Sequence, residues 1–157
     1  NIVLCGMPSS GKTTVGKALA NDFGKRFIDT DDVVVEKRKE SISDIFEKYG
    51  EGEFRKEERL AIEELSKENG LVIATGGGAV LDENNVRALK RNGVILFLDR
   101  SLKNLVATAD RPLSKDKEKL KNLFEKRYDV YKSCADAVIP ADGEIADVVE
   151  KIKGVLL

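Results

Sequence analysis

The sequence of 157 residues lacks histidine, has only two cysteines, and carries 27 Lys and Arg against 28 Asp and Glu. Without histidine, a general base must be a carboxylate, Lys, Tyr or Cys. The net charge of -1 gives no bulk attraction toward nucleic acids or membrane surfaces. Cys5 and Cys134 lie near apolar segments without metal-ligand spacing. They predict reduced, buried thiols in a cytosolic protein rather than a disulfide framework.

Long apolar runs are also missing. No segment approaches the roughly 18 residues that a membrane span needs, and no signal-type segment is present, so the sequence supports neither membrane insertion nor export. The chain begins with Asn1 directly on an apolar strand, which is compatible with a piece cut from a longer polypeptide. We expect one cytoplasmic domain, residues 1–157, and the size favours a monomer.

What the sequence does contain is an alternation of short apolar runs with longer segments of helical period. The runs are continuous, as in parallel strands covered on both faces, and span 1–5, 26–30, 71–75, 94–99 and 136–140. The predicted helices span 12–22, 31–38, 42–48, 53–68, 82–91, 101–107, 116–131 and 143–156. This order predicts an α/β open sheet with helices on both sides, whose ligands bind beyond the carboxyl ends of the strands.

The segment GMPSSGKT follows the first predicted strand and leads into a helix. It fits the pattern G-x-x-x-x-G-K-S/T, in which backbone N–H groups and the helix dipole hold a phosphate. Lys12 would reach the β- and γ-phosphates, and the Thr13 hydroxyl would bind Mg²⁺. The alternative is a glycine-rich turn with an exposed lysine, but the full spacing favours the phosphate site. The predicted nucleotide-binding residues are Gly6, Ser9, Ser10, Gly11, Lys12, Thr13 and Thr14.

Three carboxylates follow the second predicted strand, in FIDTDD. On an extended backbone Asp29 and Asp31 share a face, so they could serve Mg²⁺ and an acceptor hydroxyl, whereas Asp32 points away. The alternative is N-capping of the next helix, which is the interpretation favoured for Asp32. Asp99, at the end of the fourth strand, is a weaker metal candidate because any buried strand ending in Asp would match.

Three further segments could contribute to a site. In GEGEFRKEE, residues 50–58, the i, i+3 spacing would let Glu58 orient Arg55, although so charged a segment is usually a solvated helix face. The glycines of TGGGA, residues 75–79, would let a ligand approach bare backbone amides; the alternative is a tight turn. TADRPLSKDK, residues 108–117, has no clear period and is predicted to be a mobile loop.

Taken in order, GMPSSGKT, DTD, EFRKEE, TGGGA, RPL and KRYDVY resemble the shikimate kinase family over nearly the whole chain. The resemblance implies ATP- and Mg²⁺-dependent phosphorylation of the 3-hydroxyl of shikimate, on the route to aromatic amino acids. It also implies a three-layer P-loop kinase fold with a five-stranded parallel sheet in the order 2-3-1-4-5. A lid would lie at about 108–117 and a substrate-binding region at about 31–60.

The resemblance also assigns roles to residues. It implies that Asp29 contacts Mg²⁺ through water, that Asp31 binds substrate hydroxyls as the proposed base, and that Glu58 orients Arg55. The substrate-binding set becomes Asp31, Arg55, Glu58, Gly76, Gly77, Gly78 and Arg127, and the catalytic set Lys12, Asp31 and Arg111. Arg55 and Arg127 would hold the shikimate carboxylate, and Arg111 would close onto the phosphates. Such a set is coherent, because an anionic polyol needs guanidinium donors for its carboxylate and acceptors for its hydroxyls.

The chain departs from the family pattern in its shorter lid and around Ala107 and Thr108, where an adenine-stacking arginine is replaced. Two rivals stay open. One is another small-molecule kinase of the superfamily, such as a gluconate or nucleoside-monophosphate kinase, against which the DTD, TGGGA and arginine set argues. The other is a non-catalytic regulatory module with the same fold, against which the retention of Lys12, Thr13 and the aspartates argues.

Overall fold

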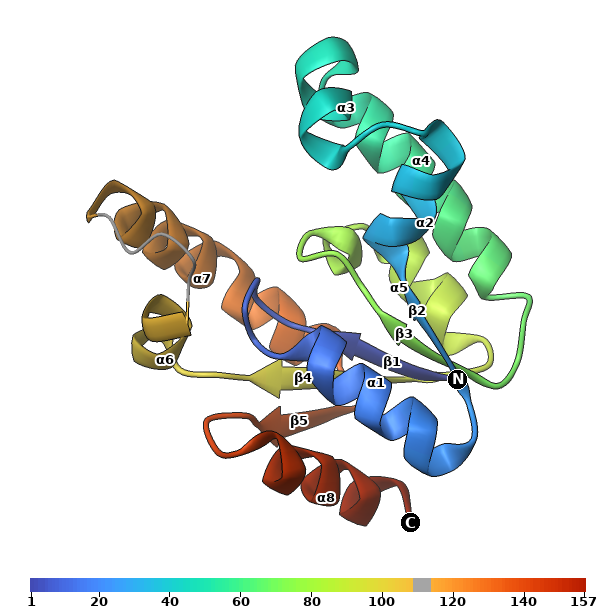
Figure 1. The fold of residues 1–157 in the computed structure, drawn as a ribbon, viewed down its shortest axis with the longest axis vertical. Helices are drawn as coiled ribbons and strands as arrows, with labels where there is room; N and C mark the ends of the chain where they lie inside the picture. Colours follow the sequence, from blue (N-terminus) through green and yellow to red (C-terminus); the bar gives the residue numbers. More distant parts are fainter. Residues whose placement is uncertain (109–113) are drawn as a thin grey trace.

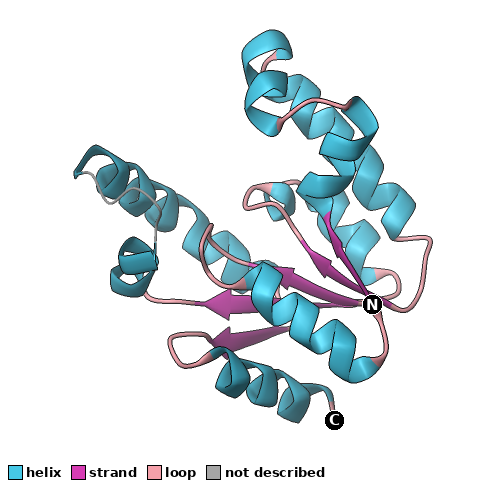
Figure 2. Ribbon diagram, in the orientation of Figure 1, coloured by secondary structure: helices cyan, strands magenta, loops and turns pink. Residues whose placement is uncertain are grey.

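The computed structural model describes residues 1–108 and 114–157. Five strands form a parallel sheet in the order β2-β3-β1-β4-β5 (Figures 1 and 2). They are β1 (Ile2–Cys5), β2 (Arg26–Asp29), β3 (Leu71–Ala74), β4 (Val94–Asp99) and β5 (Ala137–Pro140). The α/β class and the strand order predicted from the sequence are both confirmed.

Helices cover both faces of the sheet, which makes the fold three-layered (Figure 1). One face is covered by α1 (Lys12–Phe23) and α8 (Ile145–Leu156). The other is covered by α4 (Glu51–Leu65), α5 (Glu83–Lys90) and α7 (Ser114–Cys134). The remaining elements are α2 (Thr30–Arg38), α3 (Ile42–Tyr49), the 3₁₀ turn η1 (Ala79–Leu81) and α6 (Leu102–Thr108).

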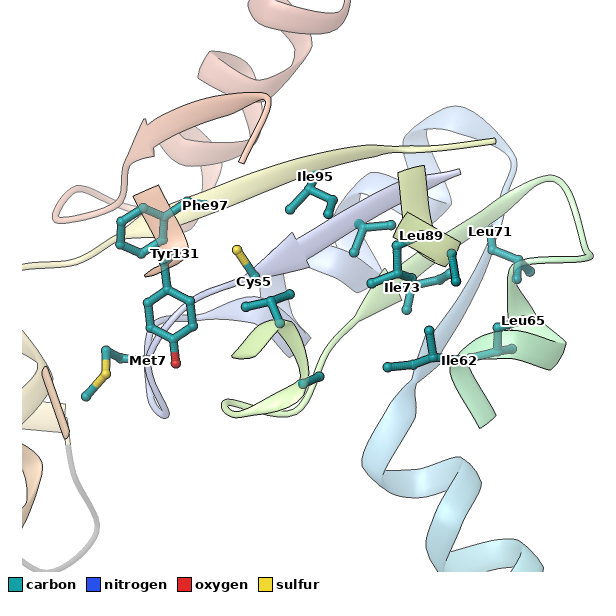
Figure 3. Close-up of a cluster of buried hydrophobic side chains, with 14 of the residues drawn as sticks. Cys5, Met7, Ile62, Leu65, Leu71, Ile73, Leu89, Ile95, Phe97 and Tyr131 are labelled. Carbon is teal, nitrogen blue, oxygen red and sulfur yellow. The ribbon is translucent and has the colours of Figure 1, made fainter. Parts of the chain in front are cut away.

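The central strand β1 shows why the predicted strands read as continuous apolar runs. Its side chains alternate, so Val3 and Cys5 enter one core while Ile2 and Leu4 enter the core on the opposite face. Figure 3 shows the first of these cores, in which Cys5 lies close to Tyr131 of α7. Because both faces are covered, each of the four positions of β1 must be apolar.

Helices α2, α3 and α4 extend beyond one end of the sheet and have a small core of their own (Figure 1). That core contains Val34, Ile45, Phe54 and Ala61. Ion pairs also join α2 to α4: Arg38 lies 2.8 Å from Glu53 and 3.3 Å from the buried Glu57. This unit coincides with the predicted substrate-binding region at about 31–60.

Several predicted boundaries differ by one to three residues from the observed ones, and two of the differences bear on the site. The second strand ends at Asp29, and α2 begins at Thr30 because the Asp29 side chain caps it. Asp31 therefore lies on a helical turn and not on an extended segment. Residues 114–117, predicted as part of a mobile loop, form the first turn of α7. None of the described helices is long and apolar enough to cross a membrane.

Candidate active site

The five strands are parallel, so the segments that follow them meet at one edge of the sheet. These segments are the GMPSSGKT loop after β1, the start of α2 after β2, the glycines after β3, Asp99 and Arg100 after β4, and the loop after β5. Most of the predicted site residues are thus placed at this edge by topology alone.

The GMPSSGKT loop has the backbone of an anion cradle. Gly6, Ser9 and Gly11 have positive φ angles of 150°, 68° and 98°. At Gly6 a β-carbon would also lie 2.9 Å from the Leu98 carbonyl oxygen, so the loop excludes a side chain there. The N-cap of α1 is Gly11, which has no side chain to offer the first N–H groups of the helix. Those donors can therefore serve a ligand phosphate.

Lys12 lies folded over this loop. Its Nζ donates to the carbonyl oxygens of Gly6 at 2.7 Å and Met7 at 2.9 Å. Burial lowers the pKa of Lys12 to about 8, against the raising influence of Cys5, Asp29 and Asp31. The ammonium group is thus charged at neutral pH and has carbonyl partners that a phosphate can replace. Thr13 and Thr14 next to it are exposed.

The start of α2 places two carboxylates opposite the phosphate loop. Asp29 Oδ1 accepts hydrogen bonds from the Asp31 N–H at 2.8 Å and the Asp32 N–H at 3.4 Å. Asp32 is an exposed residue of the first helical turn, which confirms its prediction as a helix-start residue, but the N-cap itself is Asp29. Burial raises the pKa of both Asp29 and Asp31, and the charge of Asp29 raises that of Asp31 further. Asp31 Oδ1 is buried without a hydrogen-bond partner in the described part of the chain.

Arg55 and Glu58 on α4 form the predicted pair. Arg55 Nη1 donates to Glu58 Oε1 at 2.9 Å, and Arg55 Nε donates to Glu51 Oε1 at 3.4 Å. Glu58 is only 1% exposed, and its Oε2 has no hydrogen-bond partner among the described residues. Burial raises the pKa of Glu58, with Arg55 opposing and Asp31 adding to the shift. The pair is therefore a part-buried contact, with the carboxylate buried and the guanidinium partly exposed.

The three glycines after β3 each face a different predicted substrate-binding residue. A β-carbon at Gly76 would lie 2.5 Å from Asp31 Oδ1, one at Gly77 would lie 2.9 Å from Arg127 Nη1, and one at Gly78 would lie 2.5 Å from Arg55 Nη2. None of the three has a positive φ. Their lack of side chains therefore leaves space for charged groups, which is a stronger requirement than a tight turn imposes.

Two charged side chains, from the last residue of β4 and the residue after it, lie at the same edge. Asp99 Oδ2 accepts a hydrogen bond from the Tyr128 hydroxyl at 2.8 Å, so the weak metal candidate is held by a protein partner. Arg100 Nη1 donates to the Ala141 carbonyl oxygen at 3.0 Å. Arg100 also lines a cavity of about 570 Å³ that runs from the phosphate loop to the loop after β5.

The sequence interpretation missed several of these positions. Thr30 is the middle residue of DTD, and its Oγ1 accepts a hydrogen bond from the Gly76 N–H at 2.9 Å. Arg100 and the loop after β5 had no recognisable pattern. One predicted residue, Arg111, lies outside the described residues. The predicted residues of the acceptor site, in contrast, lie together around the three glycines.

Comparison with known proteins agrees with this arrangement. The family model described as shikimate kinase matches residues 8–156. The chain belongs to the shikimate kinase family. A shikimate kinase of Clostridium beijerinckii is 40% identical over 160 residues, covering 99% of this chain and 94% of the relative. The structure of shikimate kinase from Acinetobacter baumannii in complex with shikimate has a TM-score of 0.93 at 33% identity, covering 99% of this chain and 92% of that one.

The rival kinase class shares only the fold. A gluconokinase from Sinorhizobium meliloti superposes with a TM-score of 0.62 at 16% identity, covering 96% of this chain and 87% of that one. The family match shows that the chain is an enzyme of the shikimate kinase family, and the use of ATP follows from this membership. The predictions of a small-molecule kinase and of its family are confirmed.

Proposed function

We propose that the chain transfers the γ-phosphoryl group of ATP to the 3-hydroxyl of shikimate, on the route to aromatic amino acids. One observation carries the proposal: beside a phosphate loop, two guanidinium groups converge on a segment without side chains, together with two carboxylate oxygens that have no hydrogen-bond partner among the described residues. The guanidinium groups are those of Arg55 and Arg127, and the oxygens belong to Asp31 and Glu58. This combination suits a ligand that has one carboxylate and several hydroxyls.

On the acceptor side, Arg55 and Arg127 bind the shikimate carboxylate and Asp31 Oδ1 accepts from a hydroxyl. Glu58 fixes the direction of Arg55 through the 2.9 Å hydrogen bond. The raised pKa of Asp31, caused first by burial, makes this carboxylate a better proton acceptor than an exposed one. Because the transition state of phosphoryl transfer is loose, Asp31 contributes mostly by aiming the hydroxyl in line with the phosphorus.

On the nucleotide side, residues Gly6 to Thr14 bind the phosphates through backbone N–H groups and hydroxyls. Lys12 exchanges the Gly6 and Met7 carbonyl oxygens for phosphate oxygens and neutralises the charge that develops on the γ-phosphoryl group. The nucleoside occupies the cavity lined by Arg100 and Val148. Arg111 is proposed from the family pattern to complete the phosphate site.

The donors at this edge suit Mg²⁺, a hard cation that prefers oxygen ligands and retains water. Thr13 offers a hydroxyl, and Asp29 has a second carboxylate oxygen besides the Oδ1 that caps α2. No cluster of three or more His, Cys, Asp or Glu that could hold a metal occurs in the described ranges. Thr13 would therefore bind the ion together with the phosphates, and Asp29 would contact it through water. When bound, Mg²⁺ neutralises charge on the β- and γ-phosphates.

The test is an ADP-release assay with purified protein and MgATP. Shikimate should start turnover, and gluconate or a nucleoside monophosphate should not. Shikimate binding without ADP release would favour a regulatory module, whereas turnover with gluconate or a nucleotide would favour the related kinases. The monomeric state and cytoplasmic localisation expected from the sequence remain predictions.

A further inference from the structure

Tyr131 is a buried polar side chain for which the mechanism above has no role. It lies one helical turn after Arg127 on α7, so both side chains leave the same face of the helix. Tyr131 is 0% exposed, and its ring packs against Phe97 with centroids 5.3 Å apart. Figure 3 shows the hydroxyl at the end of the ring remote from Phe97. Packing alone does not require that hydroxyl, since a phenylalanine would fill the same space.

The Tyr131 hydroxyl connects two parts of the acceptor site. It donates a hydrogen bond to the Gly77 carbonyl oxygen at 2.5 Å. The charge of Arg127 also acts on this hydroxyl: burial raises the pKa of Tyr131 to about 12, while the nearby Arg127 opposes the rise. Gly77 in turn lies against the Arg127 guanidinium, because a β-carbon there would be 2.9 Å from Nη1. Tyr131 thus binds the glycine segment that the arginine faces.

The glycine segment needs such anchors because it has no side chains of its own. Glycine has the greatest backbone freedom, so an unanchored stretch of three would sample many conformations. Two side chains from other elements hold it: Thr30 accepts from the Gly76 N–H at 2.9 Å, and Tyr131 donates to the Gly77 carbonyl oxygen. Thr30 precedes Asp31, and Tyr131 follows Arg127 by one turn. Each anchor therefore lies beside a functional side chain and fixes its position relative to the glycines.

We propose that Tyr131 is a positioning residue for shikimate binding, whose hydroxyl holds the Gly77 carbonyl, and with it the segment that faces the Arg127 guanidinium, in the geometry that receives the carboxylate of the substrate. This inference rests on the proposed function. Tyr131 does not touch the reacting atoms and takes no part in proton transfer. Its effect is on shikimate affinity, because the phosphate loop binds ATP through other residues.

The variant Tyr131→Phe tests this, because it removes the hydroxyl and keeps the ring. The matched control is Tyr128→Phe on the same helix, whose ring also packs against Phe97 and whose hydroxyl bonds Asp99 instead of the glycine segment. We expect Tyr131→Phe to raise the KM and Kd for shikimate about five- to tenfold, the effect of one lost hydrogen bond. The KM for ATP should change less than twofold, and Tyr128→Phe should leave the shikimate KM unchanged.

A second measurement separates this inference from the proposed function. Amide hydrogen exchange of residues 75–79, without any ligand, should be faster in Tyr131→Phe than in the wild-type chain and unchanged in Tyr128→Phe. Unchanged exchange, or equal effects on the KM for ATP and for shikimate, would overturn the positioning role. If the wild-type chain shows no shikimate-dependent turnover, the proposed function fails, and faster exchange in Tyr131→Phe would still show that the hydroxyl anchors the segment.

Discussion

The acceptor and nucleotide halves of the site are built in opposite ways. On the acceptor side, charged side chains from α2, α4 and α7 converge on a backbone segment without side chains, and one of them, Glu58, is buried. On the nucleotide side, the proposed phosphate contacts come mostly from backbone N–H groups at the start of α1. Lys12 is the only charged side chain within the GMPSSGKT loop. In the proposed function, the first half recognises one particular molecule and the second recognises phosphate groups.

This difference predicts which half of the site should determine the affinity for shikimate and which half should determine the rate of the chemical step. The buried carboxylate of Glu58 has already lost most of its hydration in the free protein, so this part of the acceptor side is organised before shikimate arrives. Lys12, in contrast, has to leave two carbonyl partners to bind phosphate. Changes on the acceptor side should therefore alter shikimate affinity, whereas changes on the nucleotide side should alter ATP binding and the chemical step.

The largest effect is expected for Lys12→Met. Loss of the only loop ammonium removes charge stabilisation at the transferring phosphoryl group, so kcat/KM for ATP should fall about 1,000-fold. Steady-state kinetics would measure this, and calorimetry should show shikimate affinity within twofold of the wild-type value. Lys17→Met is the control, because Lys17 is exposed on the same helix. Equal loss of shikimate affinity in Lys12→Met would show that the two halves are not independent.

The next effect is expected for Arg127→Ala. Removing charged hydrogen bonds to the substrate carboxylate should weaken shikimate binding about 30-fold and leave the Kd for ATP nearly unchanged. Lys126→Ala, at the exposed neighbouring position, should change neither affinity. Binding measured by calorimetry for each ligand separately decides the matter. Similar losses for both ligands would refute the assignment of Arg127 to the acceptor half.

A smaller effect is expected for Gly78→Ala. The added methyl group would meet Arg55 Nη2 at 2.5 Å, so the guanidinium must move, and shikimate affinity should fall about tenfold. Gly52→Ala is the control, because a β-carbon at that position on α4 meets nothing within 4 Å. Unchanged shikimate affinity in Gly78→Ala would mean that the place of Arg55 beside this glycine is not needed for binding.

Much of the fold and part of the site could be predicted from the sequence. Continuous apolar strands and their order along the chain determine which segments meet at the carboxyl edge, and the phosphate loop has a fixed spacing. The prediction that Arg55 and Glu58 share a helix face is also confirmed, because α4 extends through both residues. These features depend on local periodicity and on topology, which a sequence displays directly.

The remainder depends on contacts that no local pattern encodes. FIDTDD could be extended or helical at Thr30, and the side chain of Asp29 decides this by capping α2. The pairing of each glycine with Asp31, Arg127 or Arg55 arises only when three helices are packed around β3. The i, i+4 spacing of Arg127 and Tyr131 placed both on one face of α7, but only the packed structure shows that this face meets Gly77.

The smallest effect is expected for pH, and it concerns the nucleotide half alone. The pKa of Lys12 is lowered to about 8 by burial, and an ammonium group loses its charge as the pH rises through its pKa. Since kcat/KM for ATP reports the free enzyme, it should fall about fourfold between pH 7 and pH 8.5. At saturating MgATP the bound phosphates keep Lys12 protonated, so kcat/KM for shikimate should hold to a higher pH. A parallel decline of both parameters would show that the alkaline limb belongs to a group outside the phosphate loop.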